Sequence, residues 1–145
     1  MSVRFVLDTS VTLTWALKDE NTPYADSVLD ALLTMQAMVP AIWTLEVANV
    51  LLVSERRGRL TIAMTENFLG LLRKLPITVE TTSAGAISDH LIDIGRTYSI
   101  TSYDAAYLEL GLRENLPIAS LDARMQSVMA IVGVPLFDPT LLRAC

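Results

Sequence analysis

The chain has 145 residues and a formal net charge of −5. This acidic balance argues against a protein that binds nucleic acid through a broad basic surface. The length suits one domain with a sizeable core, so we expect residues 1–145 to form a single domain.

The composition is unusually apolar, with 52% hydrophobic residues and a mean hydropathy of +0.43. Such values indicate a full core, an apolar face kept for a partner, or both. No stretch approaches the roughly 18 uninterrupted apolar residues of a membrane span, and the N-terminus has no charged leader. We therefore expect a cytoplasmic protein without membrane association. The only cysteine is Cys145, which excludes an internal disulfide and a cysteine-based metal site.

The first predicted element is a short strand that begins at Val3 and stops at Asp8. An apolar run that ends at a carboxylate is typical of a buried strand whose last side chain lies beyond the carboxyl edge of a sheet. Thr9 and Ser10 are suited to cap the helix that follows over residues 11–17. The plain alternative is a strand-to-helix turn that happens to contain an aspartate.

Helical periodicity and short apolar runs predict the next elements. Thr22 is suited to cap a helix with Pro23 at its first position, and residues 37–40 predict a buried strand closed by a proline. The following helix carries Glu46 and ends near residues 56–58. Another helix opens at residues 60–61.

The second half continues the alternation of strands and helices. Residues 76–80 alternate like a strand, and Ser83 is suited to cap a helix through Ile94. Thr101 and Ser102 are suited to cap the next helix. Its first turn holds Asp104, where the helix dipole favours the ionised carboxylate.

The last predicted elements are two short strands with a helix between them. Gly111, inside the preceding helix, indicates close packing. Residues 116–120 predict a strand, Asp122 follows it, and residues 125–131 predict a helix. Residues 133–137 favour a final edge strand.

Strands that alternate with helices predict an α/β fold with a mainly parallel central sheet of about five short strands and helices on both faces. Polar groups at strand-to-helix junctions converge on one crevice of such a sheet. Four carboxylates occupy junctions of this kind: Asp8, Glu46, Asp104 and Asp122.

Four carboxylates in one crevice repel one another and need a compensating cation. Because the chain offers one histidine and no internal cysteine, oxygen ligands dominate and favour Mg²⁺ or Mn²⁺. Such ions hold phosphate oxygens and activate water for in-line attack. The pattern therefore predicts phosphodiester hydrolysis, and the metal charge would let an acidic protein accept a polyanionic substrate.

Four motifs carry a resemblance to a known family: FVLDTS, LEVANVL, TSYDAAYLELG and ASLDARM. In this order and over this length, the chain resembles a PIN-domain ribonuclease, and more narrowly a VapC-type toxin of a toxin–antitoxin pair. The resemblance spans essentially the whole chain, and the Tyr-Asp-Ala-Ala-Tyr segment is its most specific part.

The resemblance implies a metal-dependent endoribonuclease with a PIN-like domain. Asp8 and Asp104 would be direct ligands of Mg²⁺ or Mn²⁺, Glu46 a ligand or a group that orients water, and Asp122 a ligand through water or to a second ion. Four polar residues would support these carboxylates or contact phosphate: Thr9, Ser10, Asn49 and Ser120.

The resemblance also implies partners. The substrate would be RNA, and a cognate VapB-like antitoxin would lay its C-terminal segment in an apolar groove and send an arginine into the acidic site. The toxin itself would be a homodimer.

Two other families fit these residues less well, and one non-catalytic interpretation remains open. A haloacid dehalogenase-type phosphatase needs a second aspartate where Ser10 stands, and a receiver domain needs a lysine after a late strand. A non-catalytic PIN-like protein-binding module would use the carboxylates only as helix caps.

Several conspicuous side chains also have plain interpretations. Trp15 and Trp43 suit core packing better than base stacking, and we place His90 outside the site. The basic cluster of residues 56–59 suits either a solvated helix end or phosphate binding.

Overall fold

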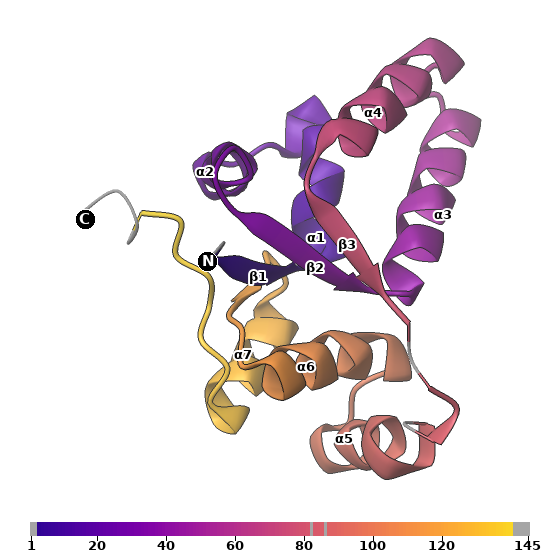
Figure 1. Ribbon diagram of the computed structural model, residues 1–145. Helices are drawn as coiled ribbons and strands as arrows, with labels where there is room; N and C mark the ends of the chain where they lie inside the picture. The colour runs from indigo at the N-terminus through magenta and orange to yellow at the C-terminus, as the bar shows by residue number, and fades with distance from the viewer. Residues whose placement is uncertain (1–2, 82, 86, 141–145) are drawn as a thin grey trace.

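The computed structural model describes residues 3–81, 83–85 and 87–140, and four parallel strands form its central sheet in the order β3-β2-β1-β4 (Figure 1). The strands are β1 (Arg4–Leu7), β2 (Gln36–Pro40), β3 (Ile77–Glu80) and β4 (Ile118–Ala119). The predicted α/β class and parallel sheet are confirmed.

The described residues contain four strands rather than about five. Residues 133–137 contribute one isolated parallel bridge, between Leu136 and Ile118. Ile118 donates its N–H to the Pro135 carbonyl, and Phe137 donates its N–H to the Ile118 carbonyl. Because Pro135 has no N–H to donate, it cannot extend this pairing into a longer ladder.

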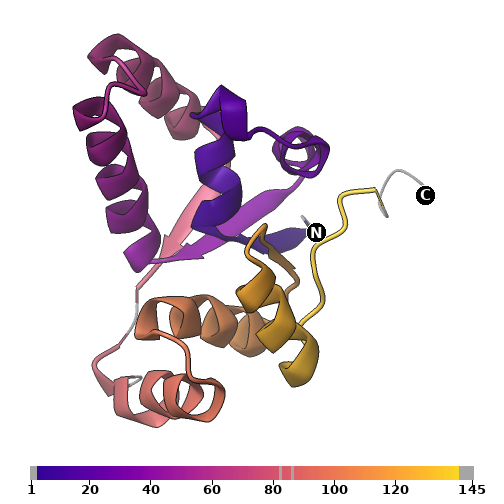
Figure 2. The same cartoon turned by 180° about the vertical axis from the view of Figure 1, so that it is seen from behind.

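Helices cover both faces of the sheet. In Figures 1 and 2, α1 to α4 lie on one side of the sheet and α5 to α7 on the other. None of the described helices combines the length and apolar character needed to cross a bilayer. The helical segments are α1 (Thr9–Thr12), η1 (Leu13–Trp15), η2 (Lys18–Glu20), α2 (Pro23–Ala31), α3 (Ile42–Arg56), α4 (Ile62–Lys74), η3 (Ile87–Leu91), α5 (Ile92–Tyr98), α6 (Ser102–Glu114) and α7 (Ala123–Val132).

Threonine side chains cap three helices. Thr22 accepts from the N–H of Ala25 at 3.0 Å, with Pro23 as the first residue of α2, as predicted. Thr61 caps α4 and Thr101 caps α6 in the same way. These contacts satisfy amide groups that have no partner within the helix.

The prediction that Thr9 and Ser10 cap the first helix is wrong. Asp8 is the N-cap residue, and Thr9 and Ser10 lie inside α1. The Thr9 hydroxyl donates to the distant Glu46, and the Ser10 hydroxyl donates to the neighbouring Asp8 side chain and accepts from the N–H of Leu121. Neither hydroxyl therefore makes the local capping bond that short polar side chains often make.

Both tryptophans pack in or against the core, as predicted. The indole N–H of Trp43 donates to Thr12 Oγ1 at 3.0 Å, and that of Trp15 donates to the Ala25 carbonyl at 2.9 Å. Phe5 of β1 stacks on Phe137 with ring centroids 4.0 Å apart. These contacts join α1 to α3, η1 to α2, and the C-terminal segment to the sheet.

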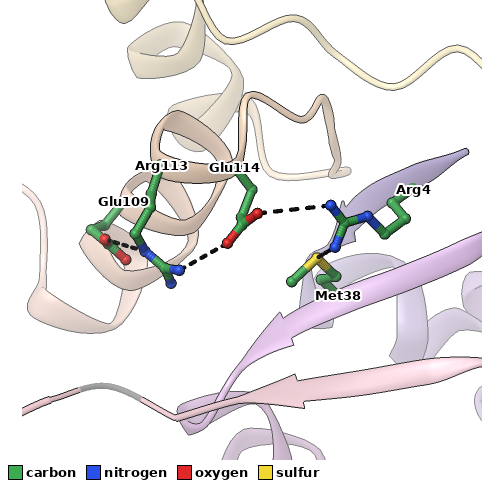
Figure 3. A network of polar contacts seen from close by, with 5 residues as sticks. All are labelled: Arg4, Met38, Glu109, Arg113 and Glu114. Atoms are coloured by element: carbon green, nitrogen blue, oxygen red, sulfur yellow. Dashed lines mark hydrogen bonds and ion pairs between the residues drawn. The ribbon is translucent and has the colours of Figure 1, made fainter.

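A polar network fixes one end of α6 against the start of β1 (Figure 3). Arg113 donates to Glu109 at 2.8 Å and to Glu114 at 3.0 Å, and Glu114 lies 3.8 Å from Arg4. Arg4 also contacts the sulfur of Met38 on β2 at 3.1 Å. Because Arg4 opens β1 and Glu114 ends α6, the first turn of α6 lies toward the carboxyl end of β1.

Gly111 lies where α6 meets β4, and the predicted close packing is confirmed. A Cβ atom at Gly111 would lie 3.1 Å from Ile118 Cδ1 and 3.3 Å from the Leu116 carbonyl oxygen. A Cβ at Gly70, inside α4, would meet no atom within 4 Å.

This contrast predicts opposite effects of the same substitution. Gly111→Ala should lower the free energy of unfolding by about 1 kcal/mol, since the clash outweighs the better helix propensity of alanine. Gly70→Ala should raise it by up to about 1 kcal/mol, because only propensity changes. Urea denaturation of both variants measures the difference, and a stabilised Gly111→Ala protein would contradict the packing argument.

Candidate active site

Two strands and two helices bring the predicted carboxylates to one edge of the sheet. Asp8 follows β1, and Asp122 comes shortly after β4, which pairs with β1 in parallel. Glu46 lies in the second turn of α3, which begins just after β2. Asp104 lies in the first turn of α6.

Asp8 is the most deeply placed of the four, with a relative exposure of 6%. Its Oδ2 accepts from Ser10 at 2.6 Å and from Ser120 at 2.9 Å. Backbone amides position both serines in turn, since Leu121 N–H donates to the Ser10 hydroxyl and Asp122 N–H donates to the Ser120 hydroxyl. Within the described residues, Oδ1 of Asp8 makes no hydrogen bond.

Burial raises the pKa of Asp8 from 3.8 to about 6. The hydroxyls of Ser10 and Ser120 lower the pKa, but they do not offset the loss of hydration, and the charges of Glu46 and Asp104 raise it further. These two charges act on Asp8 only because the chain brings all three carboxylates into one region.

Glu46 is half-buried and is held through a single oxygen. Its Oε1 accepts from the Tyr107 hydroxyl at 2.6 Å and from the Thr9 hydroxyl at 3.1 Å. The two hydroxyls also lie 2.7 Å from each other. Burial and the Glu46 hydrogen bond raise the pKa of Tyr107 well above its usual value, so this phenol stays protonated.

Asp104 is half-buried and meets charges of both signs. Burial is the largest influence and raises its pKa, and Asp122 and Glu46 raise it further. Arg124 and the Thr101 side chain lower it by less. The expectation that the helix dipole would favour the ionised form is therefore outweighed by burial and by neighbouring carboxylates.

Asp122 is exposed and acts as the N-cap of α7. Its Oδ1 accepts from Arg124 N–H at 2.9 Å and from Met125 N–H at 3.3 Å. It still contributes to the cluster, because its charge raises the pKa of Asp104. Asp122 therefore combines a capping role with a place at the edge of the acidic site.

The supporting residues proposed from sequence divide into two groups. Ser10 and Ser120 hold Asp8, and Thr9 holds Glu46. Asn49 lies one turn after Glu46 but is exposed, and its side chain makes no hydrogen bond within the part of the chain that the structure describes.

Two residues of the site were missed in the sequence. Tyr107 lies three residues after Asp104, on the same helix face, and this spacing is the signal that could have revealed it. Arg124 follows Asp122 by two residues and donates to the Ser99 carbonyl.

Within the basic cluster of residues 56–59, Arg59 pairs with Asp19 at 2.9 Å and with Glu20 at 3.5 Å.

The donor set fits a hard divalent cation. It consists of carboxylate oxygens whose charges disfavour one another, and such a cluster gains most from a nearby positive charge. Among the described residues, no group of three or more Asp, Glu, His or Cys side chains lies close enough together to hold a metal ion by itself. Waters and substrate oxygens would have to complete the coordination, as is usual for Mg²⁺.

The pKa of Asp8 sets the sign of a stability change with pH. In the window from about pH 4 to 6, the unfolded chain loses its Asp8 proton and the folded chain keeps it, so metal-free stability falls as pH rises. The Asp8 contribution amounts to at most about 3 kcal/mol. Asp8→Asn should lack this decline and should be at least as stable as wild type at pH 7.5.

Urea denaturation of both proteins in EDTA, at several pH values from 4 to 7.5, measures this difference. Parallel pH profiles, or a strongly destabilised Asp8→Asn protein at pH 7.5, would make Asp8 a structural anchor instead of a strained carboxylate.

Comparisons with solved structures show proteins of similar fold. The crystal structure of PAE2754 from Pyrobaculum aerophilum matches with a TM-score of 0.66 and 17% identity, over 88% of this chain and 86% of that chain. A toxin–antitoxin complex from Klebsiella pneumoniae matches with a TM-score of 0.60 and 15% identity, over 93% of this chain and 97% of that chain. At these identities the matches show a shared fold.

Sequence comparison gives the family. No curated protein sequence matched the chain significantly, but the family description "PIN domain" matches residues 5–130. This range covers most of the chain and contains all four carboxylates. The chain belongs to the PIN domain family.

Proposed function

We propose that the protein is a Mg²⁺- or Mn²⁺-dependent endoribonuclease that hydrolyses RNA phosphodiester bonds as the toxin of a toxin–antitoxin pair. The observation that carries the proposal is Asp8, a buried carboxylate whose pKa is raised to about 6 with Glu46 and Asp104 close enough to contribute. A fold gains nothing in stability from such a cluster, and perturbed carboxylates concentrate at functional sites.

Each residue has a distinct task in this proposal. Asp8 and Asp104 would hold the ion, Glu46 would bind it or orient the attacking water, and Asp122 would act through a water or at a second ion. When bound, the ion supplies Lewis-acid stabilisation of the phosphate and a more acidic water. Ser10 and Ser120 keep Asp8 in place, and Thr9 does the same for Glu46.

Membership of the PIN family and the Klebsiella complex support the toxin role. Such a toxin would act as a single cytoplasmic domain and would bind a VapB-like antitoxin and a second copy of itself. Helices α3 and α4 expose apolar side chains that suit such partners. They are Leu45, Leu52, Ile62, Met64 and Leu71.

A non-catalytic PIN-like binding module is the second candidate function. Asp122 favours it, because this carboxylate already caps α7 through two backbone amides. The buried Asp8 argues against it, because Asp8 makes no side-chain cap hydrogen bond at α1.

Cleavage of RNA by the purified, antitoxin-free protein tests the choice. We expect labelled single-stranded or structured RNA to be cut with Mg²⁺ or Mn²⁺, and EDTA to stop the reaction. Electrophoresis of the products measures cleavage. Activity that persists in EDTA, or the absence of cleavage across varied RNAs, would favour the binding module.

Two substitutions identify the groups that perform the chemistry. Asp8→Asn should reduce cleavage by several orders of magnitude while the protein stays folded, because a neutral amide is a poor ligand for Mg²⁺. His90→Ala should leave cleavage nearly unchanged, since His90 is exposed and lines a pocket with Ile94 and Arg113 to which none of the four site carboxylates contributes.

Initial cleavage rates of the two variants, purified in parallel, give the comparison. Residual activity in the Asp8→Asn preparation also reveals any contaminating ribonuclease. A large loss in His90→Ala at unchanged thermal stability would assign the chemistry to the wrong groups.

A further inference from the structure

Tyr107 is a buried polar side chain whose partner belongs to the acidic site. Its relative exposure is 0%, and its hydroxyl donates to Glu46 Oε1 at 2.6 Å. A buried phenol needs a partner of some kind. Tyr24 meets this need with a backbone carbonyl, that of Phe137, at 2.7 Å. Tyr107 meets it with a carboxylate of the site.

The contacts of Glu46 are one-sided. Tyr107 and Thr9 both bond to Oε1, and within the described residues Oε2 makes no hydrogen bond. Each hydroxyl has a single proton. When Tyr107 donates to Glu46, the Thr9 proton serves either Glu46 or the Tyr107 oxygen, so the three groups form one closed triangle.

Three distant parts of the chain meet in this triangle: α1, α3 and α6. A glutamate on a helix has several rotatable bonds, and an exposed one samples many orientations. The triangle restricts the orientations of Glu46. The Glu46 charge raises the pKa of both Asp8 and Asp104, so its position matters to the whole site.

We propose that Tyr107 is a positioning residue, whose buried hydroxyl, together with Thr9, fixes Glu46 by one oxygen and leaves the other for a divalent cation at the acidic site. This inference rests on the proposed function. Groups that orient metal-binding side chains in this way typically contribute 10–100-fold to metal affinity.

Binding of Mn²⁺ alone, measured by electron paramagnetic resonance, tests this role without RNA. Tyr107→Phe keeps the ring and removes only the hydroxyl, so we expect the Kd for Mn²⁺ to rise by about 10-fold or more. Thr9→Val removes the weaker bond and should raise the Kd by less. It also provides a second test should Tyr107→Phe fail to fold.

Thr14→Val is the matched control, because it removes a buried hydroxyl that donates to a backbone carbonyl, that of Val11, at 2.7 Å. Its Kd for Mn²⁺ should equal that of wild type. Equal Kd values for Tyr107→Phe and wild type, or an equal loss in Thr14→Val, would overturn the positioning role.

RNA cleavage measured beside metal binding separates this inference from the proposed function. Weakened Mn²⁺ binding in Tyr107→Phe without any cleavage by wild type would support the positioning role and refute the ribonuclease. Cleavage by wild type with unchanged Mn²⁺ binding in Tyr107→Phe would do the reverse. A wild-type protein that binds no Mn²⁺ would overturn both.

Discussion

The burial of one negative charge, on Asp8, is the constraint on which the rest of the site depends. The parallel pairing of β1 with β4 places this carboxylate beside Ser120, and α1 adds Ser10 from the other side of the junction. Two hydroxyls are weaker compensation than full hydration, so the pKa stays raised at about 6. The fold therefore keeps an acid in a place where its ionised form is costly, and a cation would remove that cost.

The Asp8-Thr9-Ser10 segment serves two carboxylates with two consecutive hydroxyls. Successive side chains on a helix diverge by about 100°, so Thr9 and Ser10 cannot bond to the same partner. Ser10 bonds to Asp8, and Thr9 bonds to Glu46 and Tyr107. Both hydroxyls are therefore used to hold carboxylates of the site, and neither caps α1.

Much of the fold could be predicted from the sequence because its signals are local. Thr22 with Pro23, and Thr101 before Asp104, are capping patterns that act within one helical turn, and both appear in the structure. The prediction of a fifth strand over residues 133–137 was wrong because Pro135 has no N–H to donate to a longer ladder. Apolar periodicity gives no information about missing hydrogen-bond donors. Tyr107 was missed for a different reason: its role depends on contacts with Thr9 and Glu46, which precede it in the sequence by 98 and 61 positions. The raised pKa of Asp104 likewise depends on burial and on remote charges, whereas its helix position was readable from the chain.

A structural role for one carboxylate does not exclude the others from the proposed cation site. Asp122 caps α7 through Oδ1, and its charge still reaches Asp104. Asp104 lies in a capped first turn, and the Arg4–Glu114 network at the far end of α6 keeps that turn at the carboxyl edge of the sheet. The same helix then presents Tyr107 to Glu46 one turn later. Helix ends and strand ends meet at this edge, but Asp122 is the one carboxylate of the four whose side chain caps a helix. The cap therefore favours a structural role for Asp122 alone and leaves Asp8, Glu46 and Asp104 to the proposed cation site.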